Sequence, residues 1–292
     1  MAWPGLCLAI GILLARTAAA QPVIGPISIV AAENFYGDVA QQLGGAHVSV
    51  TSILTNPDQD PHLFEVSPSV ARALSSAAIA VYNGVDYDPW MAKLLAVARS
   101  SDRKVIVVAD LMHKKPGSNP HLWYDPPTMP TYAKALAAML AERDPASHDD
   151  YRQRLNTFLA SLQPMETRIA GLRGKFGGTT VTATEPVFGY MAAALGLKMR
   201  NERFQLAVMN NAEPRISDVA AFEDDLRKHT VRLFLYNSQA TDPAAQRLVS
   251  IARQANIPVV GVTETAPVGR TYQDWMMDEL DAVTQALAKP PP

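Results

Sequence analysis

The sequence predicts an α/β protein with two lobes, in which parallel sheets are flanked by helices and a single long helix bridges the lobes. Short apolar runs rich in β-branched residues alternate with amphipathic stretches in the first and last parts of the chain, as in βαβ units. Between these parts, residues 129–173 show apolar residues at helical spacing and little β-branched density. The 292 residues are also too many for one small core.

The first α/β segment contains helix patterns with recognisable starts and stops. Ser67 and Pro68 are typical of a helix start, and Gly44 and Gly45 are typical of a helix end. The predicted strands cover residues 27–30, 48–54, 77–82 and 105–108, and the predicted helices cover residues 34–43, 67–75 and 89–99.

The middle segment is predicted to form two consecutive helices, of which the second covers residues 147–173. A helix of that length would run about 40 Å at ~1.5 Å per residue, long enough to cross the molecule. Because proline lacks a backbone N–H and crowds the preceding turn, we expect a kink at Pro164.

The α/β alternation then resumes until the C-terminus. The predicted strands cover residues 179–183, 232–236 and 259–262, and the predicted helices cover residues 186–194, 216–228, 242–254 and 272–288. We therefore predict a signal peptide at 1–20, an N-terminal lobe at 21–146, a linking helix at 147–173 and a C-terminal lobe at 174–292.

The N-terminal segment has the features of a secretory signal. An apolar run at residues 6–14 is followed by Arg16 and then by Ala18 and Ala20, which form an A-x-A-like cleavage site. The alternative is a short membrane anchor. Cleavage would remove Cys7, the single cysteine of the chain, so neither a disulfide nor a thiolate metal ligand is expected afterwards. We expect a periplasmic protein.

The composition excludes some classes of partner. A net charge of −2 gives no reason to expect binding to nucleic acid or to an anionic membrane surface. Beyond the signal segment, no apolar run is long enough to span a bilayer. We expect a monomer.

Two similar Pro-His motifs indicate metal binding. His62 follows Pro61, and His121 follows Pro120; in each case an apolar residue, an aromatic and a carboxylate come next. Proline restrains the backbone on both sides of its nitrogen, so both histidines should lie on stiff, non-helical loops. An imidazole held in this way beside a carboxylate is suited to bind a divalent transition metal.

Two carboxylates are predicted at an equivalent place in the second half. Glu185 follows the strand at 179–183, and Glu264 follows the strand at 259–262. Ligands of open α/β sheets bind beyond the carboxyl ends of the strands. The two histidines and the two carboxylates could therefore meet in one cleft between the lobes.

At these motifs the chain resembles the metal-binding receptor proteins of bacterial ABC transporters for zinc, manganese and iron. The resemblance covers nearly the whole chain after the signal segment. It rests on motifs that occur in the same order in both: Asp60-Pro61-His62-Leu63-Phe64-Glu65, Val81-Tyr82-Asn83-Gly84, Asn119-Pro120-His121-Leu122-Trp123-Tyr124-Asp125-Pro126, Asp144-Pro145 ahead of Tyr151 and Asn156, Phe188-Gly189-Tyr190 before Leu195-Gly196-Leu197, and Thr263-Glu264 with Tyr272.

The resemblance implies a function and a ligand set. It implies a non-enzymatic receptor that binds one divalent metal ion as cargo between two lobes and delivers it to an ABC transporter membrane permease. The implied metal ligands are His62, His121, Glu185 and Glu264. In this family the third ligand is histidine in zinc-type members and glutamate in manganese- or iron-type members. The fourth is commonly aspartate, so Glu264 departs from the usual pattern.

The donor chemistry slightly favours manganese or iron over zinc. Two imidazoles and two carboxylates form a harder, more oxygen-rich site than three imidazoles and one carboxylate, although zinc binds more tightly than manganese at most such sites. Two other functions would use the same residues, namely a secreted metallohydrolase and a metal-dependent adhesin or metal chaperone. The sequence lacks a His-Glu-x-x-His motif and a Gly-x-Ser-x-Gly elbow, which disfavours the hydrolase.

Overall fold

The computed structural model describes residues 25–56, 64, 66–210, 212–239 and 243–290. It contains two four-stranded sheets, and every strand pair in both of them is parallel. The first sheet has the order β2-β1-β3-β4 and the second has the order β6-β5-β7-β8. The strands are β1 Ile27–Glu33, β2 Val48–Leu54, β3 Ile79–Tyr82, β4 Lys104–Val107, β5 Thr180–Ala183, β6 Lys198–Arg200, β7 Phe234–Asn237 and β8 Val259–Val262.

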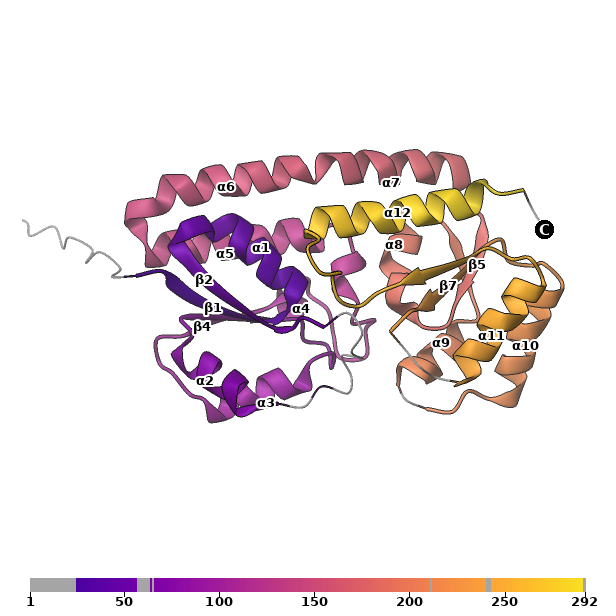
Figure 1. Ribbon diagram of the computed structural model, residues 1–292, viewed down its shortest axis with the longest axis horizontal. Coiled ribbons are helices and arrows are strands. Elements are labelled where there is room, and N and C mark those ends of the chain that lie inside the picture. The colour runs from indigo at the N-terminus through magenta and orange to yellow at the C-terminus, as the bar shows by residue number, and fades with distance from the viewer. Residues whose placement is uncertain (1–24, 57–63, 65, 211, 240–242, 291–292) are drawn as a thin grey trace, which may run out of the picture.

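Helices cover both faces of each sheet (Figure 1). The first sheet lies between α1 and α5 on one side and α2 and α3 on the other, and the second lies between α12 and the pair α10 and α11. These helices, with the short ones beside them, are α1 Asn34–Gly44, α2 Pro68–Ser76, α3 Pro89–Val97, α4 Val108–Leu111, α5 Thr128–Arg143, α8 Gly189–Ala194, α9 Glu202–Met209, α10 Ile216–Arg227, α11 Pro243–Gln254 and α12 Tyr272–Ala288. The predicted fold class is confirmed.

The bridge between the sheets consists of two helices laid end to end, α6 His148–Ser161 and α7 Gln163–Phe176, which run along one side of both lobes in Figure 1. The sequence predicts one kinked helix at 147–173. The structure interrupts it at Leu162, which keeps helical angles (φ −84°, ψ −15°). Pro164 stands in the first turn of α7, where its missing N–H costs no internal hydrogen bond. The exact lobe boundaries stay a prediction.

Local sequence signals account for several helix ends. Ser67 caps α2 by accepting a hydrogen bond from the backbone N–H of Val70, and Thr271 caps α12 in the same way through Asp274. The predicted helix at 186–194 begins as a 3-10 turn, η5 Pro186–Phe188, and continues as α8. The remaining 3-10 turns are η1 Gly45–His47, η3 Leu122–Tyr124 and η4 Pro145–Ser147.

The largest hydrophobic cluster extends from one lobe to the other, and each lobe also has a smaller cluster of its own. Phe35 and Trp123 of the first lobe stack with ring centroids 4.8 Å apart, and Trp275 of α12 lies 5.7 Å from Phe35. Hydrogen bonds also join the two lobes. Tyr124 donates to the backbone oxygen of Thr263, and Tyr272 donates to that of Trp123, both at 2.8 Å. The site described below lies at the edge of this interface.

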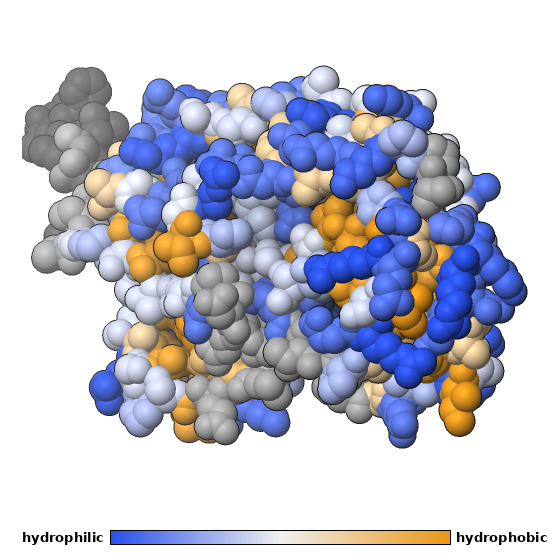
Figure 2. All heavy atoms as spheres, turned by 45° about the vertical axis from the view of Figure 1, so that its right-hand side comes forward, coloured by the Kyte–Doolittle hydropathy of each residue, from blue (hydrophilic) through white to orange (hydrophobic). Residues whose placement is uncertain are grey.

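The surface carries scattered apolar residues and many polar ones. Figure 2 shows a mostly hydrophilic face, interrupted by small hydrophobic areas. In the part of the chain that the structure describes, none of the helices combines the length and apolar character that crossing a membrane requires.

Candidate metal centre

His121 is a fully buried imidazole at the boundary between the lobes. It directly precedes η3, and Pro120 before it holds the backbone of this loop. The backbone oxygen of Pro120 accepts a hydrogen bond at 2.8 Å from the side chain of Asn83, which follows β3. The ring is therefore carried by a loop that is anchored to the first sheet.

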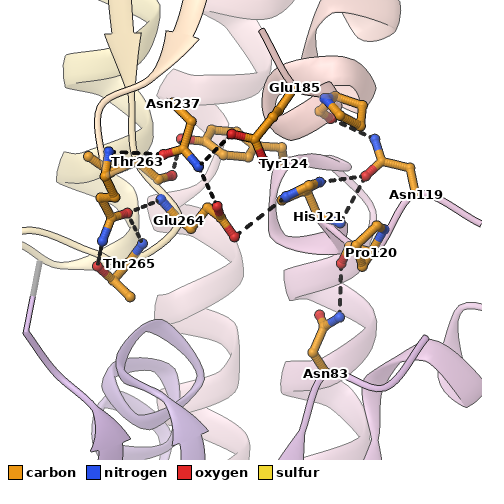
Figure 3. Close-up of polar contacts among 12 residues, drawn as sticks. Asn83, Asn119, Pro120, His121, Tyr124, Glu185, Asn237, Thr263, Glu264 and Thr265 are labelled. Carbon is orange, nitrogen blue, oxygen red and sulfur yellow. Dashed lines mark hydrogen bonds and ion pairs between the residues drawn. The ribbon is translucent and has the colours of Figure 1, made fainter. Parts of the chain in front are cut away.

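Asn119 determines how the imidazole is presented (Figure 3). Its Oδ1 lies 2.6 Å from Nδ1 of His121, and its Nδ2 donates to the backbone oxygen of Pro186 at 2.7 Å. Because the amide nitrogen is used for Pro186, Oδ1 is the acceptor, so Nδ1 of the imidazole carries the proton. In the neutral ring with this tautomer, Nε2 keeps its lone pair, as a metal ligand requires. It has no hydrogen-bond partner among the described residues.

Glu264 faces this lone pair from the other lobe. Its Oε2 lies 3.5 Å from Nε2 of His121, and both side chains are completely inaccessible to solvent. Glu264 follows β8, and its backbone N–H donates to the side-chain oxygen of Gln239. Gln239 also donates to Thr265 Oγ1 at 2.9 Å, so this loop is fixed on both sides of the carboxylate.

Glu185 provides a second buried carboxylate beside the first. It is the second residue after β5, which ends at Ala183, directly precedes Pro186 of η5 and is 6% exposed. Asn237 joins the two glutamates, because its Nδ2 donates to Glu185 Oε1 at 3.3 Å and to Glu264 Oε1 at 2.5 Å (Figure 3). The acidic half of the site is thus one hydrogen-bonded group.

The surroundings of the site exclude water. The rings of Tyr87 and Trp123 lie against His121, with centroids 6.2 Å and 5.3 Å from the imidazole. Burial raises the pKa of Tyr87 well above its usual range, and the nearby carboxylates of Glu264 and Glu33 raise the pKa further. A cation bound here would interact with the glutamates in a medium of low polarity, where electrostatic attraction is stronger than in water.

The structure tests only part of the predicted ligand set. It brings His121 and Glu264 into direct contact and joins Glu185 to Glu264 through Asn237. His62 and the neighbouring Glu65 lie outside the described residues. Within the described ranges, no three His, Cys, Asp or Glu side chains converge closely enough to hold a metal ion. The set of four ligands therefore stays a prediction.

Three residues that position the candidate ligands are not predicted from the sequence, namely Asn119, Asn237 and Gln239. Asn237 ends β7, so the rule that selected Glu185 and Glu264 as polar residues after predicted strands would also have selected Asn237. Asn119 precedes Pro120 in the second Pro-His motif, but the motif alone does not reveal its contact with the imidazole. For Gln239, the sequence offers no signal beyond its place in the same loop.

Two α/β lobes with a buried imidazole and two buried carboxylates at their boundary have the architecture of a two-lobed ligand-binding protein. The family model for the periplasmic component A of the zinc-uptake complex matches residues 29–286. The chain therefore belongs to this family, whose members bind substrate for ABC transporters and are not enzymes.

Curated relatives are similar over nearly their whole length. The chain is 26% identical over 277 residues to the manganese-binding lipoprotein MntA of Halalkalibacterium halodurans, with 90% of this chain and 89% of the relative covered. It is 21% identical over 287 residues to the manganese ABC transporter substrate-binding lipoprotein PsaA of Streptococcus anginosus, with 90% of each chain covered.

Solved structures show the same fold. The periplasmic zinc binding protein TroA of Treponema pallidum superposes with a TM-score of 0.77 at 17% identity, over 91% of this chain and all of that one. A manganese-bound periplasmic metal binding protein of Candidatus Liberibacter asiaticus superposes with a TM-score of 0.70 at 19% identity, over 89% of this chain and 99% of that one. Proteins named for zinc and for manganese are thus both similar to this chain.

Proposed function

We propose that the protein captures one divalent transition metal ion in the periplasm and delivers it to an ABC permease for import. The single observation that carries this proposal is the contact between His121 and Glu264. The imidazole directs its Nε2 atom toward a carboxylate oxygen 3.5 Å away, in a place that no solvent reaches, while its Nδ1 atom is held by Asn119. Without a cation, such a pair gains little from being buried; with one, both groups become ligands.

We propose His62, His121, Glu185 and Glu264 as the metal ligands. His121 and Glu264 stand on opposite lobes, so an ion between them would hold the lobes together. Glu185 is linked to Glu264 by hydrogen bonds, which supports its place in the same set. The names of the relatives support a metal cargo for the class as a whole.

We propose manganese or iron as the favoured cargo, ahead of zinc. The support is the donor set, because two carboxylates make the site harder than a set with three imidazoles. Export through a cleaved signal peptide at residues 1–20 belongs to the same proposal, since a receptor of this class works outside the cytoplasm.

The experiment is a metal titration of the purified chain from residue 21 onwards, after removal of metal with a chelator. We expect one ion per chain and a large loss of affinity in His62→Ala and His121→Ala. His148→Ala is the matched control, because this exposed histidine pairs, among the described residues, only with its neighbour Asp149. Absence of bound metal in the wild type would refute the proposal, and so would unchanged affinity in both site variants.

A further inference from the structure

Asn237 stands between the two glutamates because of the strand order. In the second sheet β7 lies between β5 and β8, so the last residue of β7 is flanked by the ends of both neighbours. Glu185 and Glu264 are carried by the loops that follow these two neighbours. The sheet therefore brings one amide and two carboxylates together at its carboxyl edge.

The orientation of the Asn237 amide is fixed by the backbone. Its Oδ1 accepts a hydrogen bond at 3.0 Å from the N–H of Gln239, and its own N–H donates to Thr184 Oγ1 at 3.2 Å. The amide NH₂ is thereby directed toward the glutamates (Figure 3). An asparagine has two N–H donors on this nitrogen, one for each carboxylate.

The amide engages the same oxygen of each glutamate. Its Nδ2 lies 3.3 Å from Glu185 Oε1 and 2.5 Å from Glu264 Oε1. In Glu264 this places the other oxygen, Oε2, opposite the Nε2 atom of His121. Asn237 is 5% exposed, so water does not compete effectively for these hydrogen bonds.

We propose that Asn237 is a positioning residue that makes Glu185 and Glu264 coordinate the metal through one oxygen each. This inference rests on the proposed function. An oxygen that accepts a hydrogen bond from the amide is a weaker and less accessible metal ligand, so Oε1 of each glutamate is disfavoured and binding through a single oxygen is favoured. Asn237 does not touch the metal.

The consequence concerns which metal the site prefers. Zinc is satisfied by four ligands in a tetrahedron, whereas manganese is typically bound by six, mostly oxygens. Single-oxygen binding by both glutamates keeps the number of protein donors low, so Asn237 narrows the preference for manganese or iron that the two carboxylates give the site. When the amide is removed, each carboxylate becomes able to bind through both oxygens, and this change benefits manganese more than zinc.

The test compares zinc and manganese binding by the wild type, Asn237→Ala and Asn237→Ser, with Ser238→Ala as control. Ser238 is the next residue, but its hydroxyl donates to the backbone of Val262 and not to the glutamates. We expect Asn237→Ala to lose about 10- to 100-fold in zinc affinity, the usual range for a residue that supports a ligand. Manganese affinity should fall less, so the zinc-to-manganese affinity ratio should drop.

X-ray absorption at the metal edge gives a second readout that a purely structural role would not move. The coordination number of bound manganese should rise in Asn237→Ala. Asn237→Ser keeps a polar side chain and is the milder variant in case the alanine variant fails to fold. It should lower the zinc-to-manganese affinity ratio and raise the coordination number of bound manganese, as Asn237→Ala does. Equal loss for both metals with an unchanged coordination number would overturn the inference while leaving the proposed function intact. Failure of the wild type to bind either metal would instead overturn the proposed function.

Discussion

Asn119 connects the imidazole of His121 to the opposite lobe. Its side-chain oxygen lies 2.6 Å from Nδ1 of the ring, and its nitrogen donates at 2.7 Å to the backbone oxygen of Pro186, the residue after Glu185. Tyr190 adds a further link, since its hydroxyl donates to the backbone oxygen of Asn119 at 2.9 Å. One side chain therefore selects the tautomer of a candidate ligand and spans the lobe boundary.

The first prediction concerns this asparagine. Asn119→Ala should reduce metal affinity by about 10- to 100-fold, because the imidazole loses the acceptor that fixes its tautomer. Asn119→Asp keeps an oxygen for Nδ1 and loses only the bond to Pro186, so it should retain more affinity than the alanine variant. Competition against a chromophoric chelator measures both. Equal affinity in the two variants would contradict the assigned role.

The second prediction concerns the softness of the donor set. Glu185→His replaces a carboxylate by an imidazole, which is a softer ligand and carries no charge. We expect the ratio of zinc affinity to manganese affinity to rise at least ten-fold. Parallel titrations with the two metals under anaerobic conditions measure this ratio. Glu202→His in α9 serves as a control with the same chemical change outside the site. A similar rise of the zinc-to-manganese affinity ratio in this control would contradict the role assigned to Glu185.

The third prediction concerns pH. Burial raises the pKa of Glu279 in α12 from 4.5 to about 7. The folded protein therefore binds a proton more tightly than the unfolded chain does. The stability from this group is complete below pH 4.5 and is lost as the pH rises toward 7, by up to about 3 kcal/mol.

Glu279→Gln should abolish this contribution, since glutamine does not ionise. Urea unfolding of the metal-free protein at pH 5 and pH 8 measures it. The wild type should lose more of its free energy of unfolding between these two values than the variant does. Parallel pH dependence in the two proteins would show that Glu279 is not the group responsible.

The fourth prediction concerns stability at the lobe boundary. Tyr124→Phe removes the hydroxyl that donates to the backbone oxygen of Thr263 and leaves this carbonyl without that bond. The loss of one partner of a buried hydrogen bond should lower the free energy of unfolding by about 1–3 kcal/mol. Thermal or urea unfolding measures it. Tyr82→Phe is the control, because Tyr82 lies on β3, away from this boundary.

Much of the fold could be predicted because its signals are local. Alternating strand and helix patterns, Ser67 as a cap and Pro164 as an interruption each act within one turn of chain. The sequence does not predict the strand β6, because it has only three residues and Lys198 and Arg200 at its two ends are exposed, so no apolar run marks it. Its pairing with β5 is a tertiary effect.

The candidate metal ligands could be predicted from the sequence more readily than the residues that hold them in place. His121 and Glu264 belong to motifs that can be read along the chain, but their contact spans 143 residues and depends on how the lobes are packed. The supporting role of Asn237 depends on the order β5-β7-β8, which no local pattern encodes. Polar side chains that follow strands are recognisable candidates, whereas the partner of each is decided by sheet topology.

The continuous core between the lobes has a consequence for folding. Because Phe35, Trp123 and Trp275 belong to one packed cluster that spans the boundary, each lobe would leave part of its apolar surface exposed when the other is absent. The protein should therefore unfold in one cooperative transition despite its two sheets. A chain cut between α6 and α7 should yield halves that are insoluble apart and regain structure only when they are refolded together.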